Sequence, residues 1–310
     1  MTLDTDPLGP TPTGPTSTGP TSTGPTDAEL GPKLAGKAAD LDARLRDLGS
    51  VLVAFSGGAD SALVLAAAVR ALGTARVAAA TAVSASLPMS ERGPAEAFSA
   101  SLGVDHHWPG TDEMSRDGYR ANAGDRCYFC KAELLDVLGP EAARLGLTHV
   151  ATGTNADDAI AGFRPGIRAA VERGAVSPLR DAGMTKADVR ALSHAWELPT
   201  WDKPAAACLS SRVAYGITIT PRRLQRVERA EAALRALFAA RGPAVGNLRV
   251  RDLGDSARIE VDAAVTSEVA AMPGVLEAVR DCGFDAAVVD ERGFRSGSMN
   301  EALPDGLRSA

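Results

Sequence analysis

The segment Val51-Leu-Val-Ala-Phe-Ser-Gly-Gly-Ala-Asp-Ser61 decides which fold we predict for this chain. Its apolar first half suits one buried strand, and the alanine- and leucine-rich stretch from Ala62 to Leu72 suits a helix. Between them, Gly57 and Gly58 let the backbone turn tightly, so that consecutive N–H groups and the positive end of the helix face one point. The segment therefore predicts a strand, a loop and a helix that together bind phosphate.

The side chains of the loop support the same interpretation. Ser56 and Ser61 carry hydroxyl donors, and Asp60 can bind a metal ion that neutralises phosphate charge. The Walker lysine motif G-x-x-x-x-G-K-[ST] does not occur in the sequence, so this is a different type of phosphate loop. The alternative is a turn that joins a strand to a helix and binds nothing.

Composition limits the class of protein. A length of 310 residues suits two domains. Residues 1–32 contain no Lys or Arg and repeat Thr, Gly and Pro, so we expect a disordered tail. That tail holds four acidic residues, which leaves a net charge of −2 on the rest of the chain and argues against a nucleic-acid partner. Signal-peptide and membrane-span patterns are absent from the sequence, so we expect a cytoplasmic protein with no membrane partner and with cysteines that are not disulfide-bonded.

Apolar strand candidates alternate with helical patterns through the first two thirds of the chain, which predicts an α/β fold with a doubly wound parallel sheet. The strand candidates lie at 51–55, 76–83, 103–107 and 148–152. The phosphate loop follows the first of them, at the carboxyl end of the sheet where ligands bind in such folds. We expect this domain to span 33–217.

A smaller α+β domain is predicted at 218–300, followed by a tail at 301–310. A capping box, Thr185-Lys-Ala-Asp188, begins the last helix of the first domain, and residues 198–217 then lose periodicity, as functional loops do. The elements predicted for the second domain are a helix from about 221 to 241, strands at 247–251 and 257–262, two short helices and a strand at 286–290.

Three cysteines are candidate ligands or reactive thiols. Cys127-Tyr-Phe-Cys130 opens a helical pattern with Asp125 as its expected cap, so both sulfurs lie on one helix face where the helix terminus lowers thiol pKa. Cys208 lies in the aperiodic loop. Buried structural cysteines are the alternative, and we expect that role for Cys282, which lies in an amphipathic pattern.

Polar residues at the end of the fourth strand candidate are a second ligand-binding candidate. Gly153 permits close approach, and Asn155, Asp157 and Asp158 offer hydrogen bonds or magnesium ligands. A capped turn that opens a helix is the alternative. Arg164, shortly afterwards, could reach a phosphate or an acidic substrate.

Paired arginines predict an anion site in the second domain. Arg249 and Arg251 alternate along one strand, so both guanidiniums project from one face and suit a phosphate or carboxylate. An exposed basic sheet edge is the alternative. Arg212, close to Cys208, could lower the pKa of that thiol or bind a phosphate. The four histidines have no metal-binding spacing, and we expect structural or surface roles for them.

Taken in order, these motifs resemble the LarE family of ATP-dependent sulfur insertases, a branch of the PP-loop ATP pyrophosphatases. The resemblance runs from about Val51 to Asn300, and Cys208-Leu-Ser-Ser-Arg212 and Phe294–Asn300 are its most specific parts. It implies that ATP and Mg²⁺ activate a carboxylate of pyridinium-3,5-biscarboxylic acid mononucleotide as an acyl-adenylate, with release of pyrophosphate. A sulfur nucleophile then displaces AMP and leaves a thiocarboxylate.

The resemblance also implies roles for individual residues. Asp60, Lys131 and Cys208 would be catalytic. The nucleotide would bind to Ser56–Ser61 and Gly153–Asp158. The substrate would bind to Arg164, Arg212, Arg249 and Arg251. Its phosphate would be held by Arg212, Arg249 and Arg251.

Two sources of sulfur fit the resemblance. Family members with all three cysteines hold a [4Fe–4S] cluster, which Cys127, Cys130 and Cys208 would bind here, leaving one iron free to carry sulfide. In single-cysteine members the thiol matching Cys208 gives up its own sulfur and becomes dehydroalanine.

Assembly and rival functions complete the expectations. The family resemblance implies a homo-oligomer, a hexamer, and Glu231 and Glu268 match positions that hold metal ions between subunits.

A tRNA-thiolating PP-loop enzyme would need a basic RNA-binding surface. An amidotransferase would need an N-terminal cysteine, where this chain has Thr2. A non-catalytic iron–sulfur or zinc sensor that binds nucleotide is the third rival.

Overall fold

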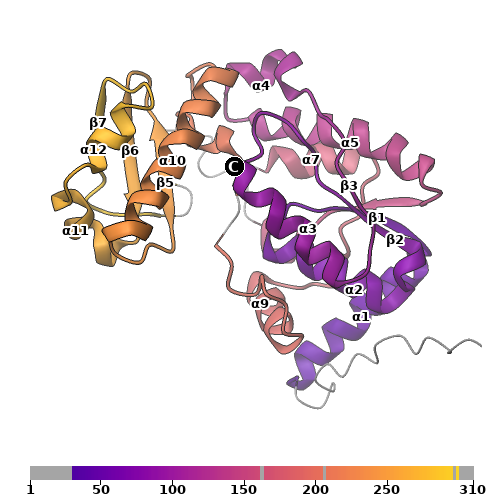
Figure 1. Cartoon of the computed structure of the whole chain (residues 1–310). Coiled ribbons are helices and arrows are strands. Elements are labelled where there is room, and N and C mark those ends of the chain that lie inside the picture. Colours follow the sequence, from indigo (N-terminus) through magenta and orange to yellow (C-terminus); the bar gives the residue numbers. More distant parts are fainter. Residues whose placement is uncertain (1–29, 161–163, 205–206, 296–297, 300–310) are drawn as a thin grey trace, which may run out of the picture.

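The computed structural model describes residues 30–160, 164–204, 207–295 and 298–299. Most of the predicted tail at 1–32, all of 301–310 and Asn300 lie outside these residues. Two units lie side by side in the described part, the first ending in the loop before α10 and the second coloured orange to yellow (Figure 1).

The first unit contains a parallel sheet, as predicted. Its strands are β1 (Val51–Ala54), β2 (Val77–Ala80), β3 (His106–His107) and β4 (His149–Ala151), in the order β3-β2-β1-β4, and every pairing is parallel. All four residues of β1 are buried, because a central parallel strand is covered on both faces.

Helices cover the two faces of this sheet. Val51 and Val53 pack into one core with α1 (Pro32–Leu48), α2 (Ala59–Leu72), α8 (Pro178–Asp181) and α9 (Lys186–Ala195). Leu52 and Ala54 pack on the other face against Leu138 of α5 (Arg126–Arg144). The alternation along one strand thus builds both layers of a doubly wound sheet. The remaining helices of this unit are α3 (Arg92–Ser101), α4 (Asp117–Ala121), α6 (Ala156–Ile160), α7 (Pro165–Glu172) and the 3₁₀ turns Thr74–Arg76, Met89–Glu91, Glu113–Ser115 and Leu209–Arg212.

Helix starts test two of the predicted caps. The capping box at Thr185 and Asp188 is confirmed, with both reciprocal hydrogen bonds formed at the start of α9. The position of Asp125 directly before α5 is confirmed, but its side chain makes no capping hydrogen bond. A turn conformation at Asp125 (φ −90°, ψ 5°) replaces the extended one that usual caps adopt.

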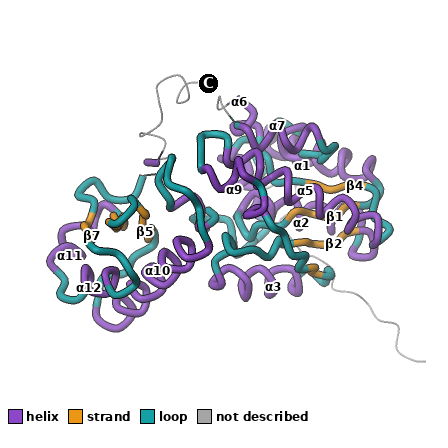
Figure 2. Tube along the Cα trace, turned by 90° about the horizontal axis from the view of Figure 1, so that it is seen from above, coloured by secondary structure: helices purple, strands orange, loops and turns teal. Residues whose placement is uncertain are grey.

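The second unit has the predicted α+β composition. Its sheet has the order β5-β6-β7, with an antiparallel first pair and a parallel second pair. Figure 2 shows this sheet and the first as separate groups of strands, each accompanied by helices. The elements are α10 (Pro221–Arg241), β5 (Leu248–Asp252), β6 (Ser256–Val261), the 3₁₀ turn Ala263–Val265, α11 (Thr266–Ala271), α12 (Val275–Arg280) and β7 (Ala286–Val289).

The two units share packing at their junction. The second hydrophobic core takes in Tyr119, Leu209 and Val213, which precede the domain boundary predicted at 218. The amide of Asn122 donates to the carbonyls of Ala214 (2.8 Å) and Ile217 (3.0 Å). The loop that carries Cys208 is therefore packed from both sides. Within the described ranges, no helix is long and apolar enough to cross a membrane.

Candidate active site

The phosphate loop is a closed turn held by its own side chains. Gly57 has φ +71°, a conformation that favours glycine. The backbone N–H of Ser56 donates to Ser61 Oγ (3.2 Å), and that hydroxyl donates to the Gly58 carbonyl (3.1 Å). These bonds fix the loop at the N-terminus of α2, where the helix dipole favours an anion.

The loop after β4 fits directly against the start of α2. A Cβ on Gly153 would lie 2.7 Å from the backbone nitrogen of Ser61, so glycine is required by close approach. Asn155 donates from Nδ2 to Asp60 Oδ1 (3.1 Å). Burial raises the pKa of Asp60, and the Asn155 hydrogen bond opposes this rise. The loop after β1 and the loop after β4 thus form one surface.

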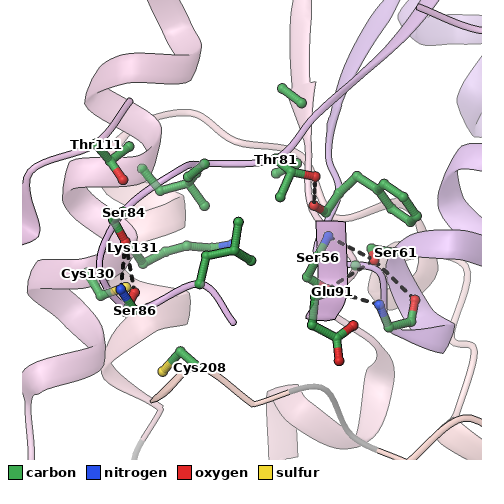
Figure 3. Close-up of a pocket in the computed structure, with 18 of the residues that line it drawn as sticks. Ser56, Ser61, Thr81, Ser84, Ser86, Glu91, Thr111, Cys130, Lys131 and Cys208 are labelled. Atoms are coloured by element: carbon green, nitrogen blue, oxygen red, sulfur yellow. Dashed lines mark hydrogen bonds between the residues drawn. The ribbon is translucent and has the colours of Figure 1, made fainter. Parts of the chain in front are cut away.

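This surface is one wall of a cavity of about 370 Å³. Figure 3 shows Ser56 and Ser61 on one side of it and Cys130 and Cys208 on the other, with Lys131 extending between them. The predicted site residues that line the cavity are Ser56, Gly58, Asp60, Ser61, Cys130, Lys131, Gly153, Asp158 and Cys208. The nucleotide loop and two of the three candidate cysteines therefore share one pocket.

The three cysteines differ in exposure. Cys127 is exposed, while Cys130 and Cys208 are half-buried, and all are free thiols. Burial raises the pKa of Cys130 and the neighbouring Cys208 and Glu113 raise it further, which opposes the lowering expected from the helix N-terminus. Among the described residues, no three His, Cys, Asp or Glu side chains converge on a point that could hold a metal ion. Cys282 is buried in the second core, in the structural role expected for it.

Lys131 is the cation that reaches into the cavity. It follows Cys130 on the first turns of α5, and burial lowers its pKa. An ammonium in this place faces both the phosphate loop and the cysteine side. That position suits a group that contacts the reacting carboxylate or phosphate.

The two acidic residues after β4, Asp157 and Asp158, have different contacts. Asp158 lines the cavity and lies 3.6 Å from Nη2 of the exposed Arg164. Asp157 instead accepts from the backbone N–H of Lys186 (2.7 Å) and so holds the first turn of α9. The capped turn considered as the alternative is also present, because the Asp158 N–H donates to Asn155 Oδ1 (3.1 Å) at the start of α6.

Arg212 and Arg251 belong to a buried network of ion pairs. Arg212 pairs with Glu231 (3.0 Å) and donates to the Cys208 carbonyl (2.8 Å). Arg251 donates twice to Glu260 Oε2, at 2.9 and 2.7 Å. The exposed basic edge considered as an alternative for Arg249 and Arg251 is wrong, because these two arginines are 7% and 5% exposed.

Arg249 is buried on the same strand as Arg251, β5. It packs over the ring of Phe294, with 5.4 Å from its guanidinium carbon to the ring centroid. Burial, together with the charge of Arg212, lowers its pKa to about 10. Clustered arginines that repel one another are a setting in which an anion is stabilised.

Glu231 and Glu268 differ in their availability to a metal ion. Glu231 is buried and accepts from Arg212 and from the backbone N–H of Val250 (3.1 Å), so its oxygens are engaged within this chain. Glu268 is exposed on α11. The histidine expectation holds for His106, which stacks on Trp108 inside the fold.

A buried carboxylate in the cavity wall was missed by sequence analysis. Glu113 accepts from Ser84 (2.5 Å), Ser86 (2.6 Å) and Thr111 (3.1 Å), and all four residues line the cavity. The carbonyl of Ser86 accepts from the N–H of Leu209 (2.9 Å), which fixes the chain next to Cys208. The Ser-x-Ser pattern after the second strand was a signal, but Glu113 is 27 residues away from Ser86 and nothing local points to it.

Comparison with known proteins found relatives along most of the chain. A protein named pyridinium-3,5-bisthiocarboxylic acid mononucleotide synthase, from Lactiplantibacillus plantarum, is 37% identical over 271 residues, which are 87% of this chain and 96% of that protein. An uncharacterized Synechocystis protein is 41% identical over 273 residues, 87% of this chain and 99% of its own length.

A more distant relative covers less of the chain. An uncharacterized protein of Methanocaldococcus jannaschii is 30% identical over 175 residues, 56% of this chain and 66% of that protein. No family model matches the sequence.

Proposed function

Because the chain belongs to the LarE family, that of the pyridinium-3,5-bisthiocarboxylic acid mononucleotide synthases, we propose that it is an ATP-dependent sulfurtransferase acting on pyridinium-3,5-biscarboxylic acid mononucleotide. It converts the ring carboxylates to thiocarboxylates for a nickel-pincer cofactor. The observation that carries the proposal is the single cavity lined by the phosphate loop, Lys131, Cys130 and Cys208.

The first step is adenylation of a carboxylate. A carboxylate is a poor electrophile because oxide is a poor leaving group, so it attacks the α-phosphorus of ATP and gains AMP as a leaving group. The loop N–H groups, the α2 N-terminus and the hydroxyls of Ser56 and Ser61 stabilise the departing pyrophosphate. Lys131 neutralises the carboxylate as it approaches the phosphorus.

Magnesium fits the acidic groups of this wall. Asp60 and Asp158 both line the cavity, and the charge of Asp158 raises the pKa of Asp60. Mg²⁺ in nucleotide sites is usually held by one or two carboxylates together with phosphate oxygens. Mg²⁺ would neutralise phosphate charge during adenylation.

Cys127, Cys130 and Cys208 would hold a [4Fe–4S] cluster. Cys127 and Cys130 lie three residues apart at the start of α5, and Cys130 and Cys208 line the same cavity. A cluster takes thiolates at separate corners and does not need them to converge on one point. It would supply the transferred sulfide at its free iron.

The sacrificial alternative is favoured by one observation. Among the described residues no three candidate ligands converge on a metal position, whereas Cys208 lines the cavity from a packed loop. Its thiolate would displace AMP to form a thioester, and elimination would leave the thiocarboxylate and dehydroalanine.

The substrate phosphate would bind beside Cys208. Arg212 bonds to the Cys208 carbonyl, and Arg249 is close enough to Arg212 and to Arg251 for their positive charges to oppose its own. Phosphate would relieve that repulsion. Exposed Arg164 would contact the rest of the substrate from the rim.

We further propose a small-molecule substrate in place of RNA, and a homo-oligomer. The charge of −2 outside the N-terminal tail supports the first, since RNA binding needs a basic surface. Family membership is the support for the second, and exposed Glu268 suits a metal ion between subunits better than engaged Glu231.

Product analysis tests the proposed function. Anaerobically purified protein incubated with ATP, Mg²⁺ and the dicarboxylate should release AMP and pyrophosphate and yield the thiocarboxylate. Release of ADP and orthophosphate would contradict the assignment. Thiolated tRNA as the product would support the tRNA rival, and nucleotide binding without turnover would support the sensor.

A further inference from the structure

We propose that Lys203 is a positioning residue for the phosphate loop: from outside the loop it fixes the Gly57–Gly58 peptide so that the Gly58 N–H faces the bound phosphate. Lys203 precedes Cys208 in the aperiodic segment and lies 146 positions from Gly57 in the sequence. This inference rests on the proposed function only in taking the loop to bind ATP.

The contacts of Lys203 are specific. Its Nζ donates to the Gly57 carbonyl (3.0 Å) and pairs with Glu91 Oε2 (2.7 Å). Both charged side chains are about three-quarters buried, with 24% and 25% exposed. Glu91 thus holds the Lys203 ammonium in place while the ammonium donates another proton to the Gly57 carbonyl.

Peptide geometry converts this contact into an orientation of the loop. In a trans peptide the C=O and the following N–H point in opposite directions. Holding the Gly57 carbonyl from outside therefore directs the Gly58 N–H to the opposite side, where Ser56 and Gly58 line the nucleotide cavity. The Gly58 N–H makes a long hydrogen bond to Ser56 Oγ (3.4 Å), which a phosphate oxygen would replace.

Lys203 acts from the back of the loop. It lines a second hollow of about 550 Å³ together with Gly57 and Glu91. Its charge is already neutralised by Glu91, so the contribution is orientation of a donor and not direct attraction of phosphate. The sequence has no Walker lysine to contact the phosphate directly. Lys203 instead stabilises the phosphate loop from behind, through its hydrogen bond to the Gly57 carbonyl.

The base of the Lys203 side chain is anchored. The Lys203 N–H donates to the Thr200 carbonyl (3.1 Å), and Arg190 of α9 donates to the carbonyls of Trp201 (3.3 Å) and Lys203 (3.4 Å). An ammonium on an anchored stem loses less freedom when it binds the loop.

Calorimetry with two probes tests the proposal. Lys203→Met should bind ATP about tenfold more weakly, as expected when a charged hydrogen bond that fixes a phosphate donor is lost. Adenosine, which has no phosphate, should bind as in the wild type. Lys203→Arg can still donate to Gly57 and pair with Glu91, so it should restore most of the ATP affinity.

A matched control is Lys37→Met. Lys37 pairs with Asp188 at a similar exposure, 20%, away from the cavity, so ATP affinity should not change. Unchanged ATP binding in Lys203→Met would overturn the proposal, and so would equal losses for ATP and adenosine, which would indicate general collapse of the site.

A crystal structure of the wild type with a non-hydrolysable ATP analogue gives a test that needs no variant. Lys203 Nζ should remain on the Gly57 carbonyl while the Gly58 N–H donates to a phosphate oxygen. Transfer of the ammonium to the phosphate would overturn the positioning role. Neither measurement needs the dicarboxylate or turnover, so product analysis of the wild type tests the proposed function separately.

Discussion

The two sides of the cavity are built in different ways. On the nucleotide side, Ser56, Gly58 and Ser61 bond to one another within six residues of chain, and a strand and a helix fix both ends of the loop. On the cysteine side, Cys130 comes from α5 and Cys208 from a loop far along the chain, and burial raises the pKa of Cys130.

This difference teaches what each side requires from a ligand. Backbone N–H groups need no change of protonation to bind phosphate, so the nucleotide side is ready as folded. Thiols must lose protons before they bind metal, and metal binding and proton release are therefore coupled. The predictions below separate the two sides, and the largest expected effect comes first.

Replacing Cys127, Cys130 or Cys208 by Ala, one at a time, should abolish iron binding and sulfur transfer, because a cluster needs all three thiolates. Formation of acyl-adenylate should persist, since the nucleotide side is untouched. Iron and sulfide analysis after anaerobic purification, with product analysis, measures both.

Cys282→Ala is the matched control, because this thiol is buried in the second core. If Cys127→Ala and Cys130→Ala stay active while the intact mass of the wild type falls by one H₂S per turnover, Cys208 is the sulfur donor and the cluster proposal is wrong.

Asp60→Asn should lower the rate of AMP formation by about 100-fold or more, as expected when a charge that stabilises the transition state is lost. Iron content should stay at the wild-type level. Asp157→Asn serves as the control, because this carboxylate binds the backbone of Lys186. An equal loss of AMP formation in both variants would show that the two acids share the nucleotide site.

Gly153→Ala should lower the free energy of unfolding by about 2 kcal/mol, because its Cβ would overlap backbone atoms of Ser61 and force α2 to shift. ATP binding should weaken with it. Gly139→Ala in α5, where a Cβ meets no atom within 4 Å, should be neutral or stabilising. Thermal or urea unfolding of the two variants compares them, and similar losses would argue against the close approach.

Arg249→Ala should weaken binding of the dicarboxylate mononucleotide by about 1–3 kcal/mol, as for loss of a charged hydrogen bond. ATP affinity should not change, because the arginine cluster lies apart from the phosphate loop. Isothermal titration of both ligands tests this, with exposed Arg222→Ala as the control. A loss of ATP affinity would show that the two anion sites are coupled.

The sequence by itself determined the parts that depend on neighbours along the chain. Periodic apolar residues and short-range turn chemistry predicted β1, the glycine loop, α2 and the capping box of α9, and the structure confirms them. The order of strands and helices likewise predicted the parallel sheet and the smaller second unit.

Only the tertiary structure decided which of two similar residues faces the ligand and which groups are buried together. It turned Asp158 into the cavity and Asp157 away, and it placed Glu113 beside Cys130. It also brought Lys203 to Gly57, 146 positions away. Burial and charge at such places depend on contacts between distant segments, and a local pattern carries no record of those contacts.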